Sequence, residues 1–188
     1  MKTDANNPSE SVVAEFASDL PPPAPQGRVF CGDLDMRIDR DGNWHYQGSP
    51  INRKELVSLF ASVLARDKDG THWLVTPAEI GRVEVEDAPF LAVELFRTGS
   101  GHDQALSFRT NVDQIVAVDE DHPIRVETNP ETGEPAPYVA IHRRMEARLA
   151  RPVYYELVDL GAEEMHDHER VFGVWSNGHF FALGRLEA

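Results

Sequence analysis

The stretch GRVEVED, residues 81–87, alternates apolar and acidic side chains. In an extended chain its two valines face one way and its two glutamates face the other, which is the period of a strand with one buried face. Because only short connections separate the neighbouring strand patterns, we expect mostly antiparallel sheet. Those neighbouring patterns are HWLVT (72–76), FLAVELF (90–96) and ALSFR (105–109).

Three further pairs of alternating stretches are predicted to form β-hairpins, because turn-forming residues lie between their members. The first turn is RDGN at 40–43, and the third is built on Asn177 and Gly178. The three hairpins span residues 35–48, 123–142 and 171–184.

Helical spacing of apolar residues predicts a helix from about Asn52 to Ala65, and Asn52 and Glu55 have the spacing of a capping box. A second helical stretch is expected from Arg143, kinked or restarted at Pro152, which has no amide hydrogen to donate. Two shorter helices are also expected. One lies between Ser9 and Leu20, and the other contains Val112, Ile115 and Val116, with Thr110 or Asn111 as its cap.

The order hairpin, helix, acidic turn and Trp-bearing strand occurs twice. INRKEL (51–56) also matches IHRRME (141–146) at three positions: Ile51 with Ile141, Arg53 with Arg143 and Lys54 with Arg144. This repetition favours an internal duplication. We therefore predict an α+β protein of two related halves, each a mostly antiparallel sheet with a packed helix. The predicted parts are an N-terminal helix and Pro-rich linker at 1–28, a first half at 29–118 and a second half at 119–188.

Three segments resemble a proteobacterial family known as domain of unknown function 1285. They are GDLDMRIDRDGNWHYQGSPI (32–51), LVTPAEIGRVEVEDAPF (74–90) and FRTNVDQIVAVDEDHPIRVE (108–127). The resemblance covers nearly the whole chain after the linker. It implies a duplicated α+β core with a pleckstrin-homology-like C-terminal half, a small nucleotide-like ligand where the halves meet, and a role in signal transduction. It assigns no catalytic residues.

Two cations at a predicted helix start are the leading candidate binding site. Arg53 and Lys54 occupy the first turn, where free amides and aligned peptide dipoles already favour an anion. A guanidinium adds a fork of donors that fits phosphate oxygens. Arg143 and Arg144 repeat the pattern in the second half. The alternative is that these side chains turn away to meet surface carboxylates.

Arg109, Thr110 and Asn111 are predicted as further polar contacts to the ligand, because they stand where a strand delivers the chain to a helix start. The alternative is plain capping by Thr110 or Asn111, with Arg109 paired to a neighbouring acid. A capping box is also expected at Thr76 and Glu79.

No metal site is predicted. Four aspartates at 33, 35, 39 and 41 alternate as in a calcium loop, but they fall in a hairpin pattern, which explains them better. His166 and His168 supply too few zinc ligands. Cys31 is interpreted as a small apolar filler rather than a nucleophile.

The composition limits the classes of partner. Eighteen Lys and Arg stand against thirty-two Asp and Glu, a formal net charge of −14, so we expect no nucleic-acid partner. No apolar run has the length of a membrane span, and no secretory signal is seen, so we expect a cytoplasmic protein that does not bind membranes. No cofactor fingerprint is present, and we expect no cofactor.

The sequence favours a non-catalytic sensor or binding protein for a small anionic, nucleotide-like ligand at the junction of the halves. Two alternatives stay open. One is an adaptor with a protein partner that it grips at a sheet edge. The other is a small hydrolase with carboxylate chemistry at Asp87 or Asp121.

Overall fold

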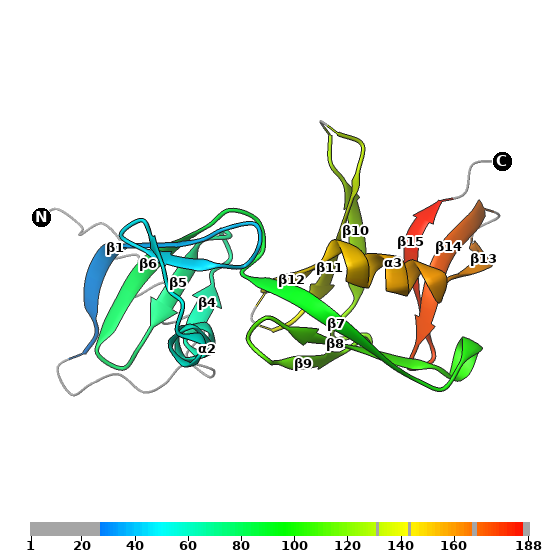
Figure 1. Ribbon diagram of the computed structural model, residues 1–188, viewed down its shortest axis with the longest axis horizontal. Helices are drawn as coiled ribbons and strands as arrows, with labels where there is room; N and C mark the ends of the chain where they lie inside the picture. The colour runs from blue at the N-terminus through cyan, green and yellow to red at the C-terminus, as the bar shows by residue number, and fades with distance from the viewer. Residues whose placement is uncertain (1–26, 131, 143, 167–168, 186–188) are drawn as a thin grey trace, which may run out of the picture. The chain divides into compact units, whose positions relative to one another are not determined.

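Strands dominate the computed structural model, which describes residues 27–130, 132–142, 144–166 and 169–185 (Figure 1). The chain divides into two compact units, an N-terminal unit of Met1–Glu86 and a C-terminal unit of Asp87–Ala188. The helix expected between Ser9 and Leu20 lies outside the described residues. Among the described residues, no helix is both long and apolar enough to cross a membrane.

The described residues of the N-terminal unit form a six-stranded sheet in the order β3-β2-β1-β6-β5-β4 and the α-helix α2. Every neighbouring pair is antiparallel except β1 and β6, which run parallel. Its elements are β1 (Val29–Ile38), β2 (Trp44–Tyr46), β3 (Ser49–Pro50), α2 (Lys54–Ser62), β4 (Leu64–Arg66), β5 (His72–Val75) and β6 (Glu79–Val85).

The hydrophobic core of the N-terminal unit is built largely from side chains of this sheet. All four residues of β5 are buried, as expected for the apolar run that the sequence shows there. Ile38 and Leu64 have no exposed surface, and Trp44 keeps 1%. The hairpin of β1 and β2 is confirmed, with Ile38 paired to Trp44.

The C-terminal unit contains a six-stranded sheet in the order β10-β11-β12-β7-β8-β9 and a three-stranded sheet in the order β13-β14-β15. Together with one α-helix, these two sheets are compatible with a pleckstrin-homology-like fold. Its elements are β7 (Phe90–Thr98), η1 (Gly101–Asp103), β8 (Ala105–Thr110), β9 (Ile115–Ala117), β10 (Ile124–Thr128), β11 (Pro135–Ala140), β12 (Glu146–Leu149), α3 (Arg151–Asp159), β13 (Ala162–His166), β14 (Glu169–Ser176) and β15 (His179–Arg185).

The structure places the division of the chain between Glu86 and Asp87, whereas the sequence analysis placed it after Val118. The reason is a pairing that joins distant parts of the chain. Strand β12 runs parallel to β7, with Ala147 opposite Phe90, and so β7, β8 and β9 share a sheet with β10, β11 and β12. A boundary after Val118 would cut this sheet in two.

The predicted mostly antiparallel architecture is confirmed, and so are the hairpins of β10 with β11 and of β14 with β15. The predicted helix at 52–65 is present but shorter, because Leu64–Arg66 forms β4. Its capping box is wrong: the N-cap residue is Arg53, and no side chain caps the helix.

The helix predicted from Arg143 is wrong in its first part. Glu146–Leu149 forms β12, in which Ala147 and Leu149 are buried and their neighbours are half-buried, and α3 begins only at Arg151. The apolar positions of this stretch fit a period of two as well as a helical stripe, and the strand pairing with β7 decides between them. Consequently INRKEL leads into a helix but IHRRME leads into a strand.

The short helix predicted after Asn111 is also wrong. Strands β8 and β9 form a hairpin there, and Thr110 accepts a hydrogen bond at its Oγ1 from the Gln114 amide at 3.1 Å. The expected capping box at Thr76 and Glu79 is instead a turn between β5 and β6, closed by the Thr76 amide bonding the Glu79 carbonyl. In both places the hydroxyl that was expected to cap a helix stabilises a strand turn.

Candidate functional site

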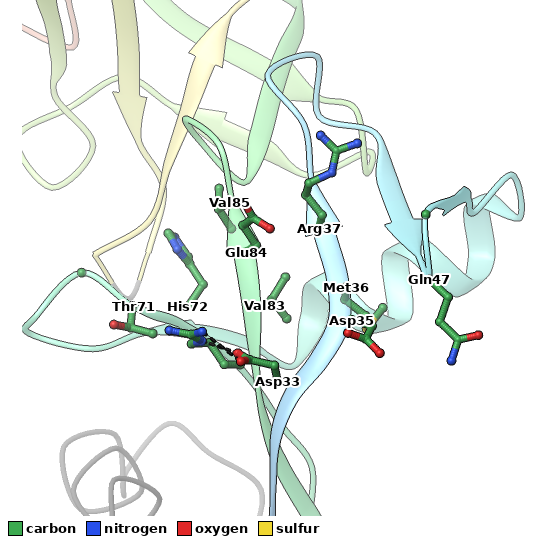
Figure 2. Close-up of a pocket in the computed structure, with 13 residues that line it drawn as sticks. Asp33, Asp35, Met36, Arg37, Gln47, Thr71, His72, Val83, Glu84 and Val85 are labelled. Atoms are coloured by element: carbon green, nitrogen blue, oxygen red, sulfur yellow. Dashed lines mark hydrogen bonds and ion pairs between the residues drawn. The ribbon is translucent and has the colours of Figure 1, made fainter.

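A polar pocket of about 850 Å³ opens on the N-terminal unit, beside the parallel pair β1 and β6 (Figure 2). Strand β1 pairs irregularly with β6, and its register shifts on both sides of Asp33. Within this irregular part Asp35 has a left-handed backbone, with φ of 51°, and its carbonyl accepts the Gln47 amide at 2.9 Å. The charged residues that line the pocket are Asp33, Asp35, Arg37, Arg82 and Glu84.

Both arginines of the pocket form ion pairs between residues distant in sequence. Arg82 donates to Asp33, with 3.0 Å between Nη2 and Oδ2, and the dashed contacts of Asp33 in Figure 2 mark this pair. The bond from Arg82 holds the pKa of Asp33 below its usual value. Arg37 pairs with Glu86. A guanidinium has five N–H donors, so each pair leaves donors for a ligand.

Two other carboxylates of the pocket differ from Asp33, because they do not form an ion pair with an arginine in the described part of the chain. Among the described residues, the side chains of Asp35 and Glu84 form no hydrogen bond or ion pair, and both residues are exposed. Figure 2 shows Glu84 between β6 and β1. The pocket therefore presents unpaired negative charge as well as partly used positive charge.

His72 contributes a buried polar atom with no partner. The residue lines the pocket, keeps 8% of its surface exposed, and its Nε2 has no hydrogen-bond partner among the described residues. Burial, with the nearby charge of Arg66, lowers the pKa of His72 to about 4, although Asp67 opposes this. The ring is therefore neutral at pH 7. An unpartnered buried polar group costs about 1–3 kcal/mol. His72 pairs across the sheet with Val83, so its ring lies on the opposite face of the sheet from Arg82 and Glu84.

The turn before His72 is fixed by the buried carboxylate of Asp67. Its Oδ1 accepts the Thr71 amide at 2.8 Å, and its Oδ2 accepts Trp73 Nε1 at 2.8 Å. These bonds fix the residues on both sides of His72, so this wall of the pocket is ordered without a ligand.

The arginine and lysine predicted at the helix start lie at the N-cap and first residue of α2, and both are exposed. Neither lines the 850 Å³ pocket. The positive charge is thus beside the helix amides as expected, while its proposed role in binding stays a prediction.

Arg109, Thr110 and Asn111 lie together at the end of β8 and in the following turn. Arg109 bonds Glu94 at 2.7 Å and Asp113 at 3.1 Å, and these contacts raise its pKa. Thr110 is fully buried, and Asn111 Oδ1 accepts the Leu91 amide at 3.1 Å. The bonds to Glu94 and Leu91 hold this segment to β7, and the bond to Asp113 lies within the β8–β9 turn. A ligand contact at these three residues stays a prediction.

Arg144 is exposed in the turn between β11 and β12, with φ of 63°, so it does not begin a helix. Arg143 lies outside the described residues. The structure therefore does not repeat at Arg144 the arrangement of Arg53 and Lys54.

The interpretation of Asp39 and Asp41 as part of a hairpin turn is confirmed. Asp39 accepts the amides of Asp41 and Asn43 at 3.0 and 2.9 Å, and it bonds His45 at 2.9 Å. Burial opposes ionisation there, but the bonds from His45 and Asn43 outweigh it and lower the pKa of Asp39 to about 2. His168 and the His166 side chain lie outside the described part of the chain.

Cys31 is exposed, so its interpretation as a small apolar filler of the core is wrong.

Asp87, considered for carboxylate chemistry, accepts hydrogen bonds from the Tyr138 hydroxyl at 2.8 Å and from Arg148 Nη1 at 2.6 Å. Burial, and then the contact with Asp87, raises the pKa of Tyr138 to about 12. These contacts anchor Asp87 in the C-terminal unit.

Sequence reasoning missed the pocket arginines and His72. One signal was available: GRVEVED has an outward face of alternating charge, Arg82 followed by Glu84, which is more than a half-buried strand requires. The strand that pairs with β6 beside the pocket is β1, and local sequence does not identify this pairing.

Two family models match the chain, and the boundary between them lies within two residues of the boundary between the units. The model described as "Domain of unknown function (DUF1285), N-terminal domain" matches residues 23–88, and "Protein of unknown function (DUF1285), C-terminal domain" matches residues 89–183. No curated protein matches the chain.

Two solved structures are similar to it. A DUF1285 family protein from Silicibacter pomeroyi DSS-3 is 46% identical, with a TM-score of 0.78, over 88% of this chain and 89% of that one. A DUF1285 family protein from Shewanella baltica OS155 is 28% identical, with a TM-score of 0.53, over 68% of this chain and 91% of that one.

Proposed function

The chain belongs to the DUF1285 family, and on that premise we propose that it is a cytoplasmic, non-catalytic sensor that binds a small polar ligand with a phosphate or carboxylate group. The proposed binding site is the pocket beside β1 and β6 of the N-terminal unit. Signal transduction is the proposed role, with occupancy of this pocket as the signal.

The presence of two guanidinium groups, Arg37 and Arg82, in one pocket is the observation that carries the proposal. The buried ring of His72 does not join them, because His72 is the cross-strand partner of Val83 and so lies on the opposite face of the sheet from Arg82.

Arg37 and Arg82 supply the chemistry for an acidic group. They reach the pocket from neighbouring strands, and a guanidinium fork matches two oxygens of a phosphate or carboxylate. Each already has a carboxylate partner in Glu86 or Asp33. An acidic group of a ligand therefore bonds the remaining N–H donors or displaces the carboxylate partner. Displacement costs little free energy, because an exposed ion pair contributes only about 0–1 kcal/mol.

Thermal melting of the full chain against nucleotides, sugar phosphates and small carboxylic acids tests this proposal. A ligand at 100 times its Kd stabilises the folded state by about 2.7 kcal/mol and raises the melting temperature. We expect Arg82→Gln to weaken binding roughly tenfold or more, because a bond to a charged group contributes about 1.5–3 kcal/mol. The matched control is Arg97→Gln, an exposed arginine of β7 that does not line the pocket.

An Arg53→Gln variant separates this pocket from the start of α2. If Arg53→Gln removes the melting shift and Arg82→Gln keeps it, the ligand binds at the helix start and the pocket proposal fails. If no compound shifts the melting temperature, the sensor proposal fails altogether.

The adaptor function is a second candidate, favoured by a groove between two edge strands of the C-terminal unit. Strand β10 ends one sheet and β15 ends the other. An apolar groove of about 360 Å³ lies between them, with Val126, Phe180 and Leu183 among its lining residues. An extended peptide gains main-chain bonds at such an edge and side-chain contacts in such a groove.

For the adaptor, we expect peptides selected for binding to the full chain to lose affinity when Ala182, an exposed residue of the groove, becomes aspartate. The control is Ala117→Asp at the exposed edge strand β9 of the same unit. Equal loss in both variants would remove the groove from consideration.

A further inference from the structure

We infer that the ligand of the N-terminal pocket is a zwitterion, a small molecule that carries an amino group as well as an acidic group. The inference rests on the proposed function and adds to it the chemical class of the ligand. It follows from the balance and the pairing of the charges that line the pocket.

The balance of charge disfavours a purely acidic ligand. Three carboxylates and two guanidinium groups line the pocket, and the carboxylate of Glu86 lies against one of those guanidinium groups. The lining is therefore net negative before any ligand binds, and the whole chain has a formal charge of −14. A phosphate or carboxylate that reaches the arginines gains their attraction, but it also meets uncompensated negative charge.

Asp35 and Glu84 carry that excess of negative charge, although Glu84 is near enough to Arg82 to help raise the pKa of that arginine, after the larger effect of Asp33. They come from different strands, both line the pocket, and within the described residues neither has a hydrogen bond or ion pair. Asp35 is held in place by its left-handed backbone and by the bond from the Gln47 amide. Glu84 follows Arg82 by two residues in β6, so both side chains leave the same face of the strand. Positive and negative binding groups are thus presented to one small volume.

A purely cationic ligand fits the pocket less well. Asp33 is already neutralised by Arg82, and both guanidinium groups repel a cation. Among the described residues, no group of three His, Cys, Asp or Glu is placed to hold a metal ion. An ammonium group beside Asp35 or Glu84, with an acid beside the arginines, satisfies both sets at once.

Matched probes test the inference. One series is phosphoethanolamine, inorganic phosphate and ethanolamine, and the other is 4-aminobutyrate, butyrate and butylamine. Each is titrated into the full chain by calorimetry at low ionic strength, where interactions of exposed charges are least screened. In at least one series, we expect the zwitterion to bind more tightly than the acid-only member. The expected gain in affinity is roughly two- to fivefold for each carboxylate that the zwitterion engages, which corresponds to about 0.4–1 kcal/mol per ion pair.

Three variants test which residues cause the preference for the zwitterion over the acid-only probe. Asp35→Asn and Glu84→Gln should each weaken zwitterion binding and strengthen the binding of inorganic phosphate or butyrate, because they remove negative charge only. Asparagine suits the left-handed backbone at residue 35, so the first variant keeps the fold. Asp41→Asn, in the exposed turn between β1 and β2, is the matched control and should change neither affinity.

The outcomes separate the inference from the proposed function. If acid-only and zwitterionic probes bind equally and Arg82→Gln weakens both, the sensor proposal stands and the zwitterion inference is overturned. If no probe binds, the inference is overturned, and the compound screen by melting then decides the sensor proposal. A zwitterion preference that survives in the Asp35→Asn and Glu84→Gln double variant also overturns the inference.

Discussion

Lowering the pH from 7 to 4 will cost the N-terminal unit about 3 kcal/mol of stability through His72 alone. The pKa of this histidine is about 4 in the folded protein and about 6.5 when unfolded. Since the unfolded chain takes up the proton first, the stability is fully present above about pH 6.5, declines below it and is lost by about pH 4. The shift of roughly 2.5 pH units corresponds to about 3 kcal/mol.

Urea denaturation at a series of pH values measures this effect. Trp44 and Trp73 report on the N-terminal unit, and a Trp175→Phe background removes the fluorescence of the C-terminal unit. We expect His72→Gln to flatten the stability curve between pH 6.5 and 4. The control is His102→Gln, whose side chain is 69% exposed, and the step should remain in that variant. A step of unchanged size in His72→Gln would mean that another group titrates.

Replacing Ser176 with alanine will lower the free energy of unfolding of the C-terminal unit by about 2–3 kcal/mol. The serine is fully buried, and its hydroxyl accepts the Leu106 amide at 3.0 Å and donates to the Val118 carbonyl at 2.7 Å. Without the hydroxyl, the Leu106 amide is left buried and unpaired, which costs about 1–3 kcal/mol in addition to the lost bond. The Val118 carbonyl keeps the bond from Asn177 at 2.9 Å.

Trp175, next to the substitution, reports this unfolding. The matched control is Ser107→Ala, a half-buried serine of β8, which should change stability by less than about 0.5 kcal/mol. Equal effects of the two substitutions would show that the buried bonds of Ser176 do not hold the end of β14 to β8.

The strands were predictable because their signals are local. Alternation at 81–87 and the buried run at 72–76 correspond to β6 and β5 with small errors at their ends. The stretch 146–149 shows the limit: its apolar residues fit two periods, and only the pairing with β7, far back in the sequence, makes it a strand. The same nonlocal pairing moves the division of the chain to Glu86.

The pocket was harder to predict, for a related reason. Its charges are paired between residues 49 positions apart, as Asp33 is with Arg82. Its lining includes Asp35 in a left-handed backbone conformation, which aspartate allows but does not require. The burial of His72 was implied by its apolar neighbours, but the missing partner of its Nε2 is a property of the folded chain alone.

The chain passes from one unit to the other between two carboxylates with opposite attachments. Glu86 pairs with Arg37 and accepts the Arg40 amide at 3.3 Å, while the next residue, Asp87, accepts hydrogen bonds from Tyr138 and Arg148. Each carboxylate therefore stabilises the unit to which it belongs, and we expect a substitution at Glu86 to act on the N-terminal unit and one at Asp87 to act on the C-terminal unit.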